Sequence, residues 1–239
     1  MTLNEMIYRR KSFRRYKSEA VDVQTVNRIL DFAACAKPLF EEIKVRFEIE
    51  EKTDVKSILP FIPKQVLAFY SEDKTGFREN AGFILQQIDL FIQSIGLGCC
   101  WIGSGRIIEE SARNDGMRYV IMLAFGYPKS DLRSAVSQFR RKKLSEISDN
   151  SDTRLEPARL APSSSNTQPW YFVNEGGIIN AYCTKHGFSK SKPMTGINQI
   201  DMGIAFAHMY VANPESFRYF KKENPKPVEG YEYIGSFEI

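Results

Sequence analysis

The chain has 239 residues, 43% of them hydrophobic and 26% charged, with a formal net charge of +4 at pH 7. This composition is typical of a globular protein and excludes an intrinsically disordered chain, which would carry fewer apolar residues and a larger net charge. No apolar run reaches the roughly 18 residues that a membrane-spanning helix needs. The first residues include several basic ones but no apolar signal core, so we expect a cytoplasmic protein without membrane association.

The cysteines and histidines show no metal-binding spacing. There is no Cys-x-x-Cys pair, and we therefore expect no metal site and a reducing compartment. The adjacent pair Cys99-Cys100 is interpreted as small buried filler, because neighbouring cysteines form a disulfide only with strain. The residues concerned are Cys35, Cys99, Cys100, Cys183, His186 and His208.

The first part of the chain predicts an α+β protein. Thr2 and Glu5 have the spacing of a capping box and predict a short helix, and Asp22 predicts the cap of a second helix. After the central helix, the glycines of Gly96 to Gly103 predict a backbone that a ligand can approach closely or, as the alternative, simply a tight turn. Apolar periodicity predicts strands at 44–50, 65–70 and 119–125, and that central helix at 79–95.

After a polar linker, Ser148 to Thr153, the order of elements restarts. The helix and Lys-Pro end of residues 25–38 have a counterpart in residues 153–169, and residues 198–212 resemble a shorter copy of the central helix. We therefore predict a diverged internal duplication with half-domains at 1–148 and 149–239. The aromatic segments Phe217–Phe220 and Tyr231–Phe237 near the end of the chain predict edge strands.

Two basic clusters lie far apart in the sequence, Arg9 to Arg15 and Arg140 to Lys143. Phosphate dianions are bound by guanidinium and hydroxyl donors that approach from several directions, so the clusters predict an anion site. The alternatives are a solvated basic face and a nucleic-acid-binding surface.

The segment Ala161 to Trp170 reads Ala-Pro-Ser-Ser-Ser-Asn-Thr-Gln-Pro-Trp. Two prolines fix its ends, and the small polar residues between them offer side-chain and backbone hydrogen bonds. Such a connection suits a planar ligand bonded along one edge. An ordinary loop with Ser and Asn turn chemistry is the alternative.

Together these segments resemble the FMN-dependent nitroreductase family. Arg10-Lys11-Ser12-Phe13-Arg14 is similar to the Arg-Arg-Ser-x-Arg opening of that family, and Ala161 to Trp170 is similar to its Ala-Pro-Ser-x-x-Asn-x-Gln-Pro-Trp segment. The family's C-terminal half is matched in order by Gly96 to Gly103, Gly126-Tyr127-Pro128, and Arg141-Lys142-x-Leu144-x-x-Ile147.

The order of these segments differs from that of an ordinary member. In ordinary members the Ala-Pro-Ser segment soon follows the opening, and the flavin binds between two subunits. Here Ala33 to Pro38 stands in that place without Ser or Asn, and the intact segment lies in the second half. The chain thus resembles the fused variant known as the putative TM nitroreductase type. The resemblance implies a nitroreductase-like α+β fold whose two diverged halves imitate the usual dimer, so the site would be complete within a monomer.

The resemblance also implies the residues that bind FMN. The first basic cluster would hold the phosphate and ribityl chain, with Arg14 nearest the N1/O2 edge of the ring, and Arg141 with Lys142 would complete the phosphate site. A backbone N–H of the segment Trp101 to Gly103 would reach N5 or O4, and the polar loop would close over the ring. The full set is Arg10, Lys11, Ser12, Arg14, Trp101, Ile102, Gly103, Arg141, Lys142, Ser163, Ser164, Asn166 and Gln168.

The implied activity is transfer of a hydride from NAD(P)H through flavin N5 to a nitroaromatic, quinone or similar small-molecule acceptor. No catalytic side chain is required, because the flavin carries the chemistry. The alternatives are a dehydrogenase or dehalogenase on the same scaffold, a flavin-binding protein without turnover, and an anion- or nucleic-acid-binding module.

Overall fold

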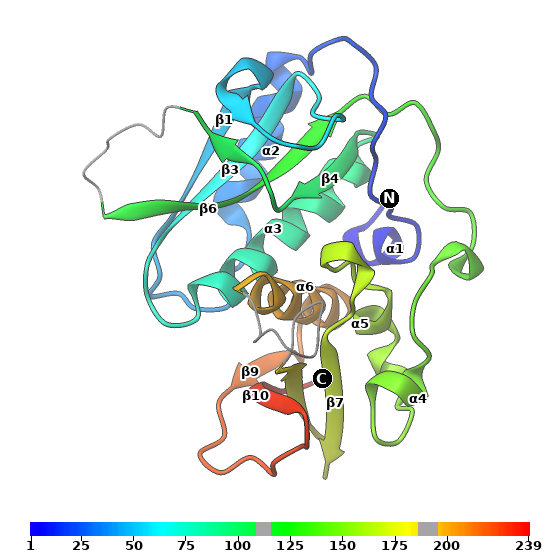
Figure 1. The fold of residues 1–239 in the computed structure, drawn as a ribbon. Helices are drawn as coiled ribbons and strands as arrows, with labels where there is room; N and C mark the ends of the chain where they lie inside the picture. The colour runs from blue at the N-terminus through cyan, green and yellow to red at the C-terminus, as the bar shows by residue number, and fades with distance from the viewer. Residues whose placement is uncertain (109–115, 186–195) are drawn as a thin grey trace.

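In the computed structural model, which describes residues 1–108, 116–185 and 196–239, two four-stranded antiparallel sheets enclose a pair of long helices (Figure 1). The first sheet, of strand order β1-β3-β6-β4, consists of Val45–Glu51, Gln65–Glu72, Met117–Gly126 and Gly98–Ile102 in that order. The second, of order β7-β8-β10-β9, consists of Trp170–Glu175, Ile178–Thr184, Tyr231–Glu238 and Arg218–Phe220. A small sheet pairs β2 (Val55–Lys56) with β5 (Arg106–Ile107).

The helices confirm the two predicted caps. Glu5 N donates to Thr2 Oγ1 over 3.1 Å, and Thr25 N donates to Asp22 Oδ1 over 2.9 Å. None of the helices in the described ranges is long and apolar enough to cross a membrane. They are α1 (Leu3–Ile7), α2 (Val23–Cys35), α3 (Phe77–Ser94), α4 (Leu144–Ile147), α5 (Glu156–Leu160) and α6 (Gly196–Ala212), with short 3-10 turns at Lys52–Asp54, Val136–Gln138, Thr153–Leu155 and Ser164–Asn166.

The two halves have the same topology. In each, a helix (α2 or α5) precedes two strands of the four-stranded sheet, a long central helix (α3 or α6) and the other two strands of that sheet; the first half also carries the short strands β2 and β5. In each sheet the strands lie in the order first, second, fourth, third, and all neighbours are antiparallel. This shared order is what an internal duplication produces. The boundary at residue 148 stays a prediction.

The central helices cross at a pair of glycines, Gly82 of α3 and Gly203 of α6. A Cβ added at Gly82 would lie 2.0 Å from the carbonyl oxygen of Ile200, and one added at Gly203 would lie 2.0 Å from that of Glu79. Each oxygen belongs to the residue three positions before the opposing glycine, so the contact is reciprocal. The crossing is therefore a pseudo-two-fold centre, like the true axis of a symmetric dimer.

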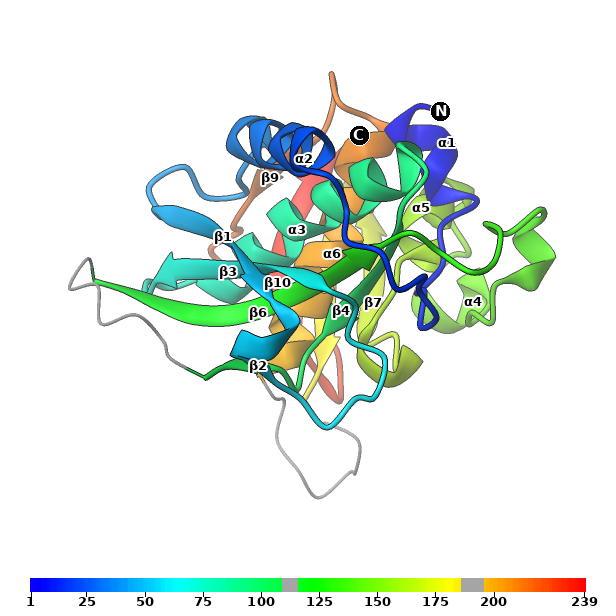
Figure 2. The same ribbon diagram turned by 90° about the horizontal axis from the view of Figure 1, so that it is seen from above.

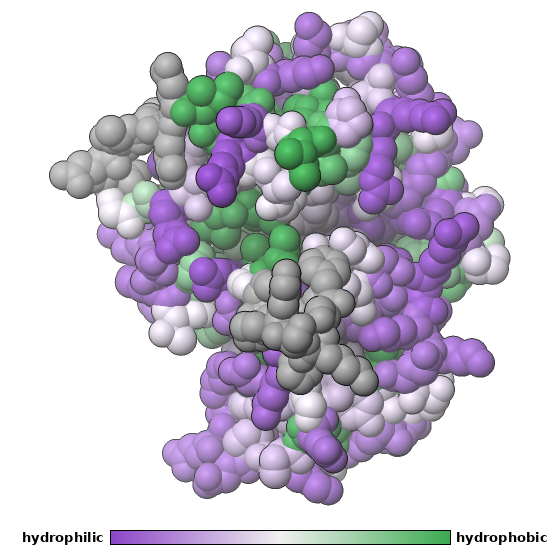
Figure 3. Space-filling view, in the orientation of Figure 1, coloured by the Kyte–Doolittle hydropathy of each residue, from purple (hydrophilic) through white to green (hydrophobic). Residues whose placement is uncertain are grey.

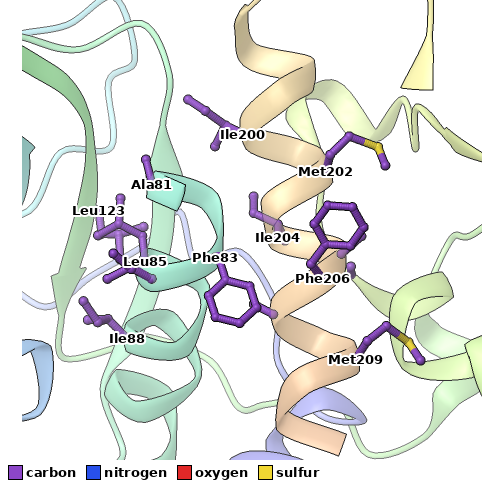
Figure 4. Packing of buried hydrophobic residues seen from close by; sticks show 14 of the residues in the cluster. Ala81, Phe83, Leu85, Ile88, Leu123, Ile200, Met202, Ile204, Phe206 and Met209 are labelled. Atoms are coloured by element: carbon purple, nitrogen blue, oxygen red, sulfur yellow. The ribbon is translucent and has the colours of Figure 1, made fainter. Parts of the chain in front are cut away.

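The core extends from this crossing into both sheets. Ala81, Leu85 and Ile88 of α3 point towards Leu123 of the first sheet (Figure 4). On α6, Phe206 points away from α3, and its ring lies 5.9 Å from that of Phe237 in β10 (Figure 4). Seen from above, the first sheet crosses over the helix pair, and α2 packs on α3 (Figure 2). Hydrophilic side chains cover most of the face in Figure 3, and the larger apolar patches lie in its upper part, over the first sheet.

Two sequence-based expectations were wrong in detail. The segment after α3 is not a turn: Gly96 ends the helix with φ +90, and the chain then forms β4, paired with β6 from Gly98 onwards. Cys99 and Cys100 are buried in this strand, as expected of small filler. The second aromatic segment forms β10, which lies between β8 and β9, so of the two aromatic segments only the first, in β9, forms an edge strand. Phe237 of β10 is buried in the core, and β10 pairs with β8 on one side and β9 on the other.

Candidate functional site

Two adjoining cavities lie between the halves of the molecule, and each is lined by residues from both. The basic compartment has a volume of about 490 Å³ and the apolar compartment about 440 Å³, within the ordinary range for small-molecule sites. They share Ser12, Arg14, Pro162, Ser163 and Ser165, so one ligand can extend through both.

The basic compartment gathers guanidinium groups that repel one another. Burial and then the charge of Arg10 lower the pKa of Arg133 to about 10. Burial and then the charges of Arg10, Arg133 and Arg159 lower the pKa of Arg141 to about 9. Both groups still carry their charge at neutral pH, and an anion bound among them would relieve the repulsion. Arg14 and Arg140 line the same compartment. The donor set therefore fits a phosphate.

Arg10 differs from the other arginines of the basic compartment because its charge is paired with a buried carboxylate of the protein, that of Asp89. Its guanidinium Nε lies 2.9 Å from Asp89 Oδ2, and both side chains are buried. The Asp89 carboxylate also accepts from Gln86 Nε2 over 3.0 Å and from Gln93 Nε2 over 2.8 Å. Gln86 Oε1 in turn accepts from Trp101 Nε1 over 3.2 Å. This buried network on α3 fixes Arg10 beside the basic compartment and Trp101 beside the apolar one.

Arg141 holds the polar loop that follows α5. Its Nε donates to the carbonyl oxygen of Ala161 over 2.9 Å, one Nη donates to that of Leu160 over 3.3 Å, and the other donates to Asn166 Oδ1 over 2.6 Å. The sequence predicted a phosphate ligand here, and the structure adds a role in orienting the loop.

The loop itself adopts a strained backbone. Ser165, Asn166 and Gln168 have φ values of +48, +58 and +49, in the left-handed region that non-glycine residues rarely occupy. Such residues cost on the order of 1–3 kcal/mol each and persist where the surroundings hold them. Here Gln168 N donates to Ser163 Oγ over 2.8 Å, and Asn166 is held by Arg141. The result is a rigid, polar rim shared by both compartments.

The apolar compartment lies between the strands of the first sheet and helix α6. Trp101 of β4 and Ile121 of β6 line one side, and Ile200 and Ile204 of α6 line the other. Phe61 also lines it, with the guanidinium carbon of Arg14 5.8 Å from its ring centroid. Among the described residues of this lining, Asp201 alone carries a carboxyl group. An apolar space with few polar groups suits an aromatic ring system.

Most of the predicted site residues line these compartments. They are Arg10, Ser12, Arg14, Trp101, Gly103, Arg141, Ser163, Ser164 and Asn166.

Four predicted residues lie outside the lining. The Lys11 backbone N–H donates to Gln93 Oε1 over 3.1 Å. Ile102 is fully buried in a separate cluster on the other face of β4. Lys142 and Gln168 bond each other: Lys142 N donates to Gln168 Oε1 over 2.7 Å, and its Nζ donates to the Gln168 carbonyl over 2.9 Å. This pair connects the loop to the segment before α4.

Sequence reasoning missed Arg133, Asp201 and Phe61. Arg133 lies in a polar connection without periodicity, so its charge was the only signal. Asp201 had a clearer signal, since it is an ionisable residue inside the apolar run of α6. Phe61 lies between β2 and β3, where no motif marks it.

The pseudo-symmetric position in the molecule carries a different lining. A cavity of about 400 Å³ lies there beside the connection after α2. Phe40, Glu41 and Glu42 line it, where the second half has its Ser-Ser-Asn loop. Its two carboxylates stand beside two cations, Lys37 and Arg218, so this cavity lacks the cluster of guanidinium groups that lines the basic compartment.

The described residues contain no group of three or more His, Cys, Asp or Glu side chains placed to hold a metal ion. His186 lies outside the described residues. His208 is fully buried, its Nδ1 lies 2.8 Å from the Pro157 carbonyl oxygen, and burial lowers its pKa to about 3. Its imidazole is therefore neutral.

Comparison with known proteins agrees with this geometry. The family described as Putative TM nitroreductase matches residues 2–213. The chain belongs to this family. The resemblance stated from the sequence motifs is thereby confirmed. Membership in a nitroreductase family supports an oxidoreductase. No curated protein matches the chain.

Solved structures show the fold. A putative nitroreductase from Thermotoga maritima MSB8 is 20% identical and has a TM-score of 0.66, over 99% of this chain and 92% of that chain. A nitroreductase family protein from Clostridium difficile 630 is 17% identical with a TM-score of 0.50, over 63% of this chain and 99% of that one. The nitroreductase-like fold is confirmed. The Clostridium difficile protein is covered almost completely by only part of this chain, which is consistent with two fused half-domains here.

Proposed function

We propose that the protein is an FMN-dependent oxidoreductase that takes a hydride from NAD(P)H and passes it to a nitroaromatic, quinone or similar acceptor. The observation that carries the proposal is the junction of two compartments between the halves. One compartment is lined by several guanidinium groups, which suit a phosphate. The other is an apolar space beside a polar loop. FMN has the same two parts, a phosphate and a ring. Family membership supports the same reading.

The residues present fit the parts of FMN. Arg133 and Arg141 would hold the phosphate, because both line the basic compartment and the repulsion between its guanidinium groups favours an anion. Arg14 lines both compartments, so it would lie where the phosphate end meets the ring. Trp101 and Ile204 would exclude water from the ring. When bound, FMN supplies the centre that accepts and donates the hydride. The protein then contributes binding, orientation and a dry surface.

We also propose that one chain binds one FMN without a partner chain. Each compartment already combines segments of both halves, as the interface of a dimer would. The cavity in the mirror position has two carboxylates beside two cations and no cluster of arginines, so it offers a second phosphate no comparable site.

The flavin itself tests the proposal. Purified protein, as isolated and after reconstitution with FMN, is denatured, and the released flavin is identified by chromatography. FMN is the expected result, and FAD or no flavin would contradict the proposal. Anaerobic addition of NADH or NADPH to the loaded protein should bleach the flavin absorbance. A bound flavin that neither nicotinamide reduces would contradict the donor and favour a flavin-binding protein without this turnover.

A further inference from the structure

Asp201 is a buried residue in the lining of the apolar compartment, and only one of its two carboxyl oxygens has a hydrogen-bond partner among the described residues. It lies within α6 and is 2% exposed. Its Oδ1 accepts from the backbone N–H of Ser164 over 3.0 Å. Its Oδ2 is buried and has no hydrogen-bond partner in the part of the chain that the structure describes. A buried carboxylate oxygen without a donor is costly, whereas a neutral carboxyl can itself donate from that oxygen.

The surroundings of Asp201 favour its neutral form. Burial raises its pKa to about 7, although the Ser164 N–H acts in the opposite direction. Cys183 of β8 interacts with Asp201, and the pKa of its thiol is raised by burial and then by the carboxyl groups of Asp201, Glu232 and Glu79. None of these groups brings a positive charge. Arg14 lines the same compartment and is the cation on that side.

The mirror half shows that holding the loop does not require a carboxyl. Asn80 lies two residues before Gly82 in α3, as Asp201 lies two residues before Gly203 in α6. Asn80 Oδ1 accepts from the backbone N–H groups of Leu39 and Phe40, over 2.8 and 3.1 Å. An amide oxygen therefore serves the equivalent connection. The half that lines the apolar compartment instead has a residue that can bind and release a proton.

We propose that Asp201 holds a proton for the ligand: with its carboxyl neutral, Oδ2–H donates to a ring nitrogen or carbonyl oxygen of flavin in the apolar compartment. This inference rests on the proposed function. It makes FMN binding a proton-coupled event, since a ring that covers the compartment excludes water from Asp201 and disfavours the carboxylate further. It also identifies a polar anchor for the ring besides the loop.

The sign of the pH dependence follows from linkage. FMN binds the neutral carboxyl better than the carboxylate, so binding takes up a proton. Affinity should then be full below the carboxyl's pKa in the free protein and fall as pH rises through it, by up to about tenfold per pH unit. The second ionisation of the FMN phosphate, near pH 6, has the opposite effect and belongs to the basic compartment. Measurements above about pH 6.5 separate the two.

The test compares wild type with Asp201→Asn, which keeps an acceptor for Ser164 N–H and a permanent donor at the other atom. Apoprotein is titrated with FMN by fluorescence quenching from about pH 6.5 to about pH 8.5. The wild-type affinity should fall by roughly tenfold or more across this range, and that of Asp201→Asn should stay nearly constant. Asp31→Asn, an exposed change on α2, should behave as wild type.

A second measurement uses wild type alone, and so tests the inference even if Asp201→Asn folds poorly. Calorimetric titration of wild type with FMN, in two buffers of different ionisation heat near pH 8, should show net proton uptake approaching one per FMN. Uptake of no proton, or equal pH profiles for wild type and Asp201→Asn, would overturn the inference and leave the proposed function intact. Failure of wild type to bind FMN at any pH would overturn the proposed function and this inference with it.

Discussion

Two neighbouring arginines, Arg14 and Arg15, give a matched test of the proposed flavin site. Both side chains are exposed and carry the same charge, but Arg14 lines both compartments and Arg15 lines neither. Removing one charge-assisted contact costs roughly 1.5–3 kcal/mol, so Arg14→Ala should raise the Kd for FMN by roughly 10- to 150-fold. The long-range field that both arginines contribute is screened at physiological salt. Arg15→Ala should therefore change the Kd by less than about threefold.

The assay is quenching of FMN fluorescence by apoprotein at two salt concentrations, with urea unfolding of each variant as a control. Neither substitution should change stability appreciably, because exposed side chains away from structural features contribute little. Equal losses of affinity in the two variants would show that the basic segment acts as a diffuse surface patch, and the assignment of Arg14 would be refuted.

Further substitutions test the other parts of the account. Arg141→Ala should weaken FMN binding by about 2 kcal/mol or more, measured by the same quenching assay, because it removes a charge and releases the loop. Arg10→Ala should cost about 3–5 kcal/mol of unfolding free energy in urea, since Asp89 would keep a buried charge without its cation; a loss below about 1 kcal/mol would contradict the buried pair. Gly82→Ala and Gly203→Ala should each destabilise by about 2 kcal/mol or more, and by similar amounts, because the crossing is reciprocal. A large difference between the two would contradict the pseudo-symmetry.

The sequence was most informative where local chemistry decides the structure. The caps at Thr2 and Asp22 and the apolar periodicity of α3 could be read from short stretches, and the repeated order of elements followed from comparing such stretches along the chain. The motifs also marked segments that the fold brings together, since Arg14 and Ser163 line the same two compartments.

Other features depended on contacts between distant residues. No local pattern shows that Asp89 forms a buried ion pair with Arg10, or that Lys142 donates to Gln168. The segment after α3, where a turn was expected, forms strand β4 because it pairs with β6, which lies about 25 residues further along the chain. Motif matching names a position as belonging to the site, but packing decides whether its side chain faces the cavity or the core.

The central claim is that one chain, through its two unlike halves, forms one complete flavin site. The measurement that tests it most directly is the FMN-to-protein ratio combined with light scattering on dilute protein. We expect one FMN per chain, retained when the protein is monomeric. Two FMN per chain would contradict the loss of the mirror site, and release of FMN whenever the protein is monomeric would show that a partner chain completes the site.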